Sequence, residues 1–203
     1  MDIDTLLHQL ADEHVAYSCD RPEEFHHAGD LTVVSNLVFS SPDPSEFSEC
    51  SGVPAGRHPV HVGVVRTHDT ETGRETPAVT LVLVPLAAPE VIAEAEFEDA
   101  VEDYQPLGPD LGFLWDATAM DAFAPGRPRP AGLADLDALV ARVEAGLATP
   151  DGAGRAPAWV DLPIDETTGA NLLAFPVSAE AALCLEGRDA DGTLVALLFT
   201  GTM

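Results

Sequence analysis

The chain has 203 residues, 46% of them hydrophobic, and 35 acidic against 9 basic residues leave a formal net charge of −26. This length suits one domain with a sizeable core, and the hydrophobic fraction separates the chain from disordered proteins of similar charge. No apolar run approaches the about 18 residues of a membrane-spanning helix, and a pI near 4.2 argues against direct nucleic-acid binding, which rests on lysine and arginine.

The first third of the chain predicts a helix and then a strand. Apolar side chains recur at helical spacing over residues 3–15, and Asp2 or Asp4 is placed to cap that helix, which we expect to pack on the body of the domain. Residues 31–39 are rich in β-branched side chains and are followed by Ser-Ser-Pro-Asp-Pro, which predicts one strand and then a long loop to about residue 59.

Two hairpins are the clearest local predictions. Residues 60–66 and 78–84 are strand-like and flank a polar, turn-forming segment at 68–74, so we predict a hairpin over 60–84. Residues 181–186 and 193–200 flank a segment that ends in Asp-Gly, which predicts a second hairpin over 181–200. Between the hairpins, an apolar stripe at helical spacing predicts an amphipathic helix over residues 133–147.

Residues 90–104 fit two patterns. Apolar side chains fall on one helical face, while residues 92–98 also alternate as a strand does; we favour a helix near 90–104. That helix would carry Glu90, Glu94, Glu98 and Glu102 at a four-residue spacing, where like charges cost a few tenths of a kcal/mol per pair (~0.3). The four acids either face a partner or are screened by water and counter-ions.

Together these elements predict an α+β fold in a single domain over residues 1–203. The sheet is expected to be mainly antiparallel and sandwich-like, built on hairpins at 60–84 and 181–200. Three helices are expected with it: the N-terminal helix at 3–15, one near 90–104 and one at 133–147.

The strong catalytic and nucleotide-binding signatures are missing from the sequence. It has no Gly-x-Ser-x-Gly, His-Glu-x-x-His, Gly-x-x-x-x-Gly-Lys or Cys-x-x-Cys motif. His58 and His61 lie three residues apart at the start of a predicted strand, where side chains at that spacing point to opposite faces, so we predict no metal site there. We also predict no cofactor. Whether the protein is an enzyme stays open, and the missing motifs argue against it.

Cysteine usage and the N-terminus favour a cytoplasmic protein. Cys19, Cys50 and Cys184 are odd in number and distant in sequence, which argues against a disulfide framework and predicts free, structural thiols. The chain begins without the basic and apolar segments of a secretory signal. All nine basic residues are arginine, which fits the coding bias of a GC-rich genome or, as the alternative, adaptation to high salt.

The distribution of charge suggests a first function. Residues 1–50, 90–121 and 161–203 carry most of the acids, separated by two neutral segments. If these blocks meet in the fold, they form a negative face that attracts a basic partner. We therefore predict a non-catalytic, immunity-like or inhibitor module that binds a basic protein through Glu90, Glu94, Glu98 and Glu102; a solvated, solubilising surface is the alternative.

A second hypothesis is a small-molecule-binding protein or an enzyme of unknown reaction. Arg57, His58, Trp115 and Asp116 are residue types that could share a cleft, where arginine would hold an anionic group and histidine or aspartate would move a proton. The alternative for these residues is structural: Asp116 precedes Ala-Thr-Ala-Met and is well placed to cap a short helix, and Trp115 suits a core.

Three segments resemble the uncharacterised bacterial domain-of-unknown-function family 4241. VPAGRHPV at 53–60 is similar to that family's Pro-Gly-Arg-Tyr-Pro-Val, LGFLWDA at 111–117 to its Gly-aromatic-x-x-Asp-Ala, and residues 171–200 to its closing strand-turn-strand. The chain departs from the family pattern at Thr118, where glycine is usual, and at 175–180, where the family has Ser-Gly-x-Gly-Asp-Gly. The resemblance implies an α+β domain and no established activity, substrate or catalytic residue.

Overall fold

The computed structural model of the protein describes residues 1–15, 20–40, 49–68, 75–100, 111–123, 130, 132–150, 154–177 and 181–202. Its helices are α1 (Ile3–His14), α2 (Pro89–Ile92), α3 (Ala117–Asp121) and α4 (Leu136–Leu147). Its strands are β1 (Glu24–Val33), β2 (Leu37–Phe39), β3 (Glu49–Ser51), β4 (Gly56–His68), β5 (Glu75–Pro85), β6 (Glu96–Asp99), β7 (Leu111–Asp116), β8 (Val160–Asp165), β9 (Ala170–Pro176), β10 (Ala181–Arg188) and β11 (Leu194–Thr202).

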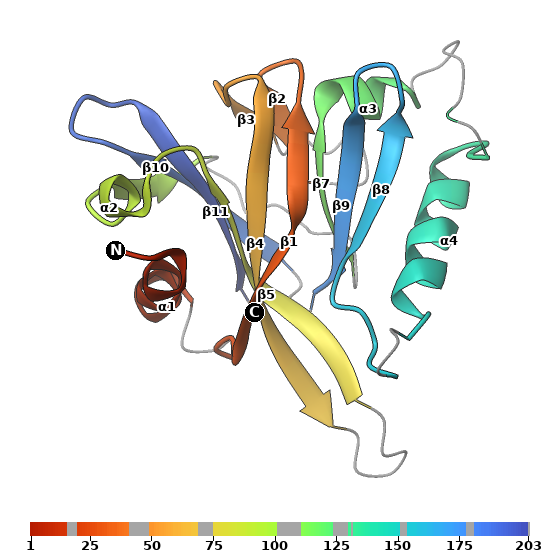
Figure 1. Cartoon of the computed structure of the whole chain (residues 1–203), viewed down its shortest axis with the longest axis horizontal. Helices are drawn as coiled ribbons and strands as arrows, with labels where there is room; N and C mark the ends of the chain where they lie inside the picture. Colours follow the sequence, from red (N-terminus) through yellow and green to blue (C-terminus); the bar gives the residue numbers. More distant parts are fainter. Residues whose placement is uncertain are drawn as a thin grey trace.

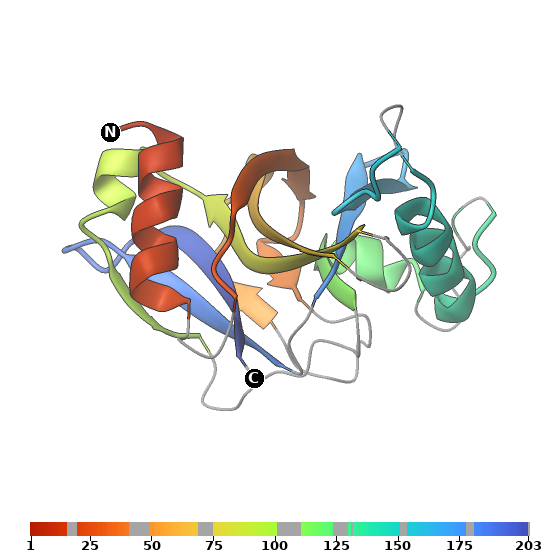
Figure 2. The ribbon, with the colours of Figure 1, turned by 90° about the horizontal axis from the view of Figure 1, so that it is seen from below.

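The strands form two antiparallel sheets with helices on their outer sides. The six-stranded sheet has the order β1-β4-β5-β11-β10-β6, and the five-stranded sheet has the order β3-β2-β7-β9-β8. Helix α1 lies beside the first sheet and α4 beside the second, at opposite ends of the molecule (Figures 1 and 2). The predicted α+β, sandwich-like, mainly antiparallel fold is therefore confirmed.

Three apolar clusters explain this layering. The largest fills the space between the sheets with side chains from both of them, such as Val82 and Leu173. The second packs α1 against the outer face of the six-stranded sheet, and the third packs α3 and α4 against the outer face of the five-stranded sheet. Strand β5 alternates between the first two clusters, so both of its faces are buried, which accounts for its nearly continuous apolar sequence.

The N-terminal helix and both hairpins form where the sequence predicts them. The Asp2 carboxylate accepts a hydrogen bond from the Thr5 N–H at 2.8 Å and caps α1, whose Leu6 and Leu10 are buried against the sheet. Strands β4 and β5 pair over the predicted 60–84 hairpin, and β10 and β11 pair over 181–200. Gly192 closes the second turn with a φ of +78°, a conformation that favours glycine.

The predicted helix at 133–147 begins at Leu136. Asp135 caps it, with its carboxylate 2.9 Å from the Ala138 N–H, and Leu139 and Val143 enter the third cluster. Leu133 is buried in the same cluster although it precedes the helix. The apolar stripe therefore extends one turn beyond the helix, because a buried side chain can also come from the connecting segment.

The single strand predicted at 31–39 is wrong, because this run changes sheets. Residues up to Val33 belong to β1 in the six-stranded sheet, and Leu37–Phe39 form β2 in the five-stranded sheet. The chain turns at 34–36, where Asn36 has a φ of +60°. The predicted loop to about residue 59 contains β3 and the start of β4.

The helix predicted near 90–104 is also wrong. Helix α2 ends at Ile92, and Glu96–Asp99 form β6, an antiparallel edge strand on β10. The strand is favoured because Phe97 packs directly over Gly187, where an added Cβ would lie 2.8 Å from the phenyl ring. With Glu90 on α2 and Glu98 on β6, these two glutamates no longer share one helical face. Residues 101–104 of the predicted helix lie outside the described residues.

Candidate functional site

Strand β6 and the β10–β11 turn enclose an acidic hollow. We use this name for the depression lined by Glu94, Glu96, Glu98 and Asp189 together with Arg188, Ala190 and Gly192, with a volume of about 490 Å³. Glu96 and Glu98 are exposed and fall on one side of β6, since alternate residues of a strand share a face, while Phe97 falls on the other side. Four carboxylates and one guanidinium thus meet in this hollow.

The register of β6 and β10 places charged side chains of both strands on one face. Glu98 lies opposite Glu186, and Glu96 lies opposite Arg188. Arg188 donates a hydrogen bond to the Glu186 carboxylate at 2.6 Å and another to the Gly192 carbonyl at 2.9 Å. In the described part of the chain, Glu94, Glu96 and Glu98 have no ion pair, so their charges face solvent.

Of the four glutamates predicted to bind a partner, one is placed elsewhere and one lies outside the described residues. Glu90 lies on α2 and bonds with the N-terminal ammonium of Met1. Glu102 lies outside the described residues. The structure therefore brings together Glu94 and Glu98 of the predicted set and adds Glu96. A search for acids at every second residue, the spacing of one strand face, would have identified Glu96. The four-residue spacing of a helix face does not include it.

A second depression, the Arg57 groove, follows the line where the edges of the two sheets meet. It has a volume of about 640 Å³, and the polar side chains in its lining are Asp30, Thr32, Arg57, Asp161, Thr168 and Asn171. The Arg57 guanidinium is 73% exposed and pairs with the Asp30 carboxylate at 3.0 Å. The groove is thus lined by one exposed guanidinium, that of Arg57, and by the carboxylates of Asp30 and Asp161.

Asn171 joins the two sheets at the floor of this groove. Its side-chain oxygen accepts from the Thr32 N–H at 2.9 Å, and its Nδ2 donates to the Asp30 carbonyl at 2.9 Å. The same Nδ2 donates to the Asp161 carboxylate at 2.8 Å. The amide therefore bonds to the edge of β1 that no described strand pairs with, as the backbone of a neighbouring strand would, and the Thr32 N–H and the Asp30 carbonyl are both satisfied.

The other three residues of the predicted cleft are not in the groove. His58 bonds through Nε2 to the Pro54 carbonyl at 2.7 Å. Trp115 is fully buried in the cluster under α3 and α4, where it packs edge-on against Phe113. Asp116 is fully buried and caps α3 through the Thr118 N–H at 2.7 Å. Of the four predicted residues, Arg57 alone lines the groove.

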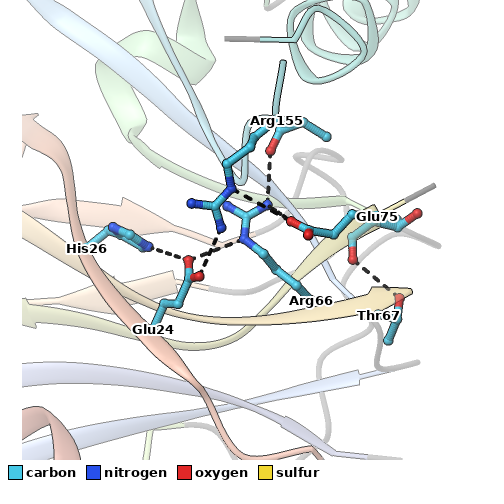
Figure 3. A network of polar contacts seen from close by, with 8 residues as sticks. Glu24, His26, Arg66, Thr67, Glu75 and Arg155 are labelled. Atoms are coloured by element: carbon cyan, nitrogen blue, oxygen red, sulfur yellow. Dashed lines mark hydrogen bonds and ion pairs between the residues drawn. The ribbon is translucent and has the colours of Figure 1, made fainter. Parts of the chain in front are cut away.

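A charged network ties the edge of the six-stranded sheet to the segment before β8 (Figure 3). The Glu24 carboxylate accepts from His26 at 3.0 Å, Arg155 at 2.9 Å and Arg66 at 3.2 Å, and Arg66 also donates to Glu75 at 3.1 Å. The hydrogen bonds from His26 and the two arginines outweigh partial burial and lower the pKa of Glu24 to about 2. No sequence motif indicated this network, because its members lie up to 131 residues apart.

Comparison of the chain with protein-family models, curated proteins and solved structures finds no match. The resemblance to the domain-of-unknown-function family 4241 stays a prediction from its three motifs. Over the described residues, no three histidine, cysteine, aspartate or glutamate side chains gather as metal ligands would. No helix in the same part of the chain is long and apolar enough to cross a membrane.

Proposed function

We propose that the protein is a non-catalytic binding module whose acidic hollow receives a basic protein. The observation that carries this proposal is the set of three glutamates, Glu94, Glu96 and Glu98, which lie beside Asp189 without a cationic partner in the described chain. Like charges placed side by side repel one another, and a cationic partner converts that repulsion into attraction. The hollow also provides a concave surface into which arginine or lysine side chains fit.

The position of the hollow supports docking. Strand β6 is the last strand of the six-stranded sheet, so one of its edges has no neighbour among the described strands. Acidic side chains on an edge strand discourage pairing with a second copy of the same acidic chain. These acidic side chains do not oppose binding of a basic chain. The negative charge that keeps copies of this protein apart therefore favours a partner of opposite charge.

The experiment compares two triple charge reversals as capture reagents. The variant E94K/E96K/E98K reverses the three glutamate charges of the acidic hollow. The control variant D137K/E144K/E166K makes the same change in net charge at exposed acids of α4 and the β8–β9 turn. Proteins retained from lysate of the source organism at low and moderate salt are identified, and association with the purified partner is timed. We expect a basic protein to bind the wild type and the second variant, and to associate with the first at least about tenfold more slowly.

Equal binding by both variants would contradict the proposal, since general negative charge would then explain the association. So would a partner whose binding does not weaken as salt rises, because charges on an exposed surface are screened by salt. Circular dichroism of both variants checks that each has folded.

The Arg57 groove supports a second candidate, the binding of a small anionic molecule. A guanidinium forms paired hydrogen bonds with carboxylate and phosphate groups, and Arg57 has most of its side chain exposed within a groove of suitable size. A thermal-shift screen with carboxylated and phosphorylated metabolites tests this. Stabilisation by a compound should disappear in Arg57→Ala and persist in Arg142→Ala, an exposed arginine on α4; an unchanged response in Arg57→Ala would exclude the groove.

A further inference from the structure

Two cysteines far apart in the sequence meet in the core between the sheets. The sulfur atoms of Cys50 and Cys184 are 3.0 Å apart, although 134 positions separate the residues. Cys50 lies on β3, the edge strand of the five-stranded sheet, and Cys184 lies on β10 of the six-stranded sheet. Both side chains are buried and belong to the apolar cluster that the two sheets share.

We propose that Cys50 and Cys184 are a covalent modification site at which an oxidant joins the two sheets by an intramolecular disulfide. A disulfide has its sulfur atoms about 2.05 Å apart, so the pair has to close by about 1 Å. Strand β3 can supply this movement, because it is three residues long and pairs in register with β2 alone among the described strands. Strand β10, in the other sheet, is held on both sides by β11 and β6.

The oxidant class is a small disulfide such as oxidised glutathione. The thiolate of one cysteine attacks the small disulfide, forms a mixed disulfide and releases one small thiol. The second cysteine then attacks the protein sulfur of that mixed disulfide and releases the second small thiol. The two protein thiols together lose two electrons and two protons, and the small disulfide takes up both and becomes two thiols.

Burial makes this reaction slow in the folded protein. The hydrogen bond with Cys50, together with burial, raises the pKa of the Cys184 thiol, so little of the reactive thiolate is present at neutral pH. Attack therefore requires β3 to separate from β2 or the chain to be unfolded. For this reason the test allows the bond to form during folding, when both thiols are accessible.

The experiment refolds the Cys19→Ser variant, which keeps only the proposed pair, from denaturant in mixtures of reduced and oxidised glutathione. We expect both thiols to disappear as the oxidised fraction rises. Trypsin, which cleaves after Arg57, Arg155 and Arg188, should release a peptide that ends at Arg57 cross-linked to residues 156–188, and reduction should separate the two. Because the bond closes a long loop, the oxidised form should melt about 10 °C higher than the reduced form.

Cys50→Ala in the same Cys19→Ser background is the matched control and should yield neither the cross-link nor the rise in Tm. Two free thiols in the folded Cys19→Ser protein at every glutathione ratio would overturn the proposal. In the wild-type chain, a disulfide between Cys19 and either partner in preference to the Cys50–Cys184 bond would also overturn it. Circular dichroism and the free-thiol count, made on the same samples, separate these outcomes from a failure to fold.

Discussion

Asp116 is a buried carboxylate that binds two segments of the chain, the turn between β1 and β2 and the start of α3. Its Oδ2 accepts from the N–H groups of Val34 and Ser35, both at 2.9 Å, and from the Ser35 hydroxyl at 2.8 Å. Its Oδ1 accepts from the Thr118 N–H at the start of α3. Burial raises its pKa, but the hydrogen bonds from Ser35, Thr118 and Val34 outweigh burial, and the pKa lies below its ordinary value of 3.8.

Asp116→Ala should therefore be severely destabilising. It leaves the donors around the carboxylate without an acceptor, and we expect the free energy of unfolding to fall by about 3 kcal/mol. The matched control is Asp135→Ala, which removes one exposed capping bond on α4 and should cost about 1 kcal/mol. Urea denaturation measures both, and equal losses would show that the turn between β1 and β2 does not depend on Asp116.

Glu24 should make stability depend on pH in the acid range. Its folded pKa of about 2 lies below the ordinary value of 4.5, so its contribution is complete above about pH 4.5 and is lost as pH falls toward 2. Glu24→Gln should lower the free energy of unfolding at neutral pH by about 1 kcal/mol, a value reduced by screening because the side chain is one-third exposed.

The difference between wild type and Glu24→Gln should shrink steadily as pH falls below about 4.5, which denaturation at several pH values measures. Glu144→Gln, on the exposed face of α4, is the control and should change stability by less than about 0.5 kcal/mol at every pH. A difference that grows as pH falls would contradict the role given to the network.

At the scale of elements, the edge of β1 depends on a side chain from the other sheet. Asn171→Ala removes three hydrogen bonds and leaves the Thr32 N–H and the Asp30 carbonyl without their partner. We expect a loss of about 2–3 kcal/mol and faster amide hydrogen exchange at Thr32, measured by NMR. Gln9→Ala, which removes one amide contact on α1, is the control and should cost less than about 0.5 kcal/mol.

The element predictions differ in outcome for a physical reason. The hairpins and the two longer helices follow from local periodicity, caps and turns, because each needs only its own residues and one apolar face. The short strands β2 and β6 are set by partners distant in sequence, β7 for β2 and β10 for β6. The sequence shows the acidic pattern at 90–98 but not whether it forms a helix or a strand. That choice depends on the edge of β10, which is available to pair with β6.

At the scale of the whole molecule, the net charge of −26 should oppose the folded state at low ionic strength. Raising sodium chloride to about 0.5 M shortens the Debye length to about 4 Å and screens this repulsion. We expect Tm to rise by several degrees over that range, measured by calorimetry. A fall in Tm would show that ion pairs such as Arg66–Glu24 outweigh the repulsion, and a rise that continues at molar salt would favour adaptation to high salt over coding bias.

The sequence by itself determined the α+β class, the two hairpins, the helices near 3–15 and 133–147, and the excess of acid that motivates a basic partner. These features depend on composition and on patterns within about 25 residues, where propensity and periodicity act. Only the tertiary structure decided that residues 31–39 change sheets, that Asp116 bonds to the turn between β1 and β2, and that Cys50 meets Cys184. Each of these depends on a contact between residues more than 70 positions apart, for which local sequence carries no signal.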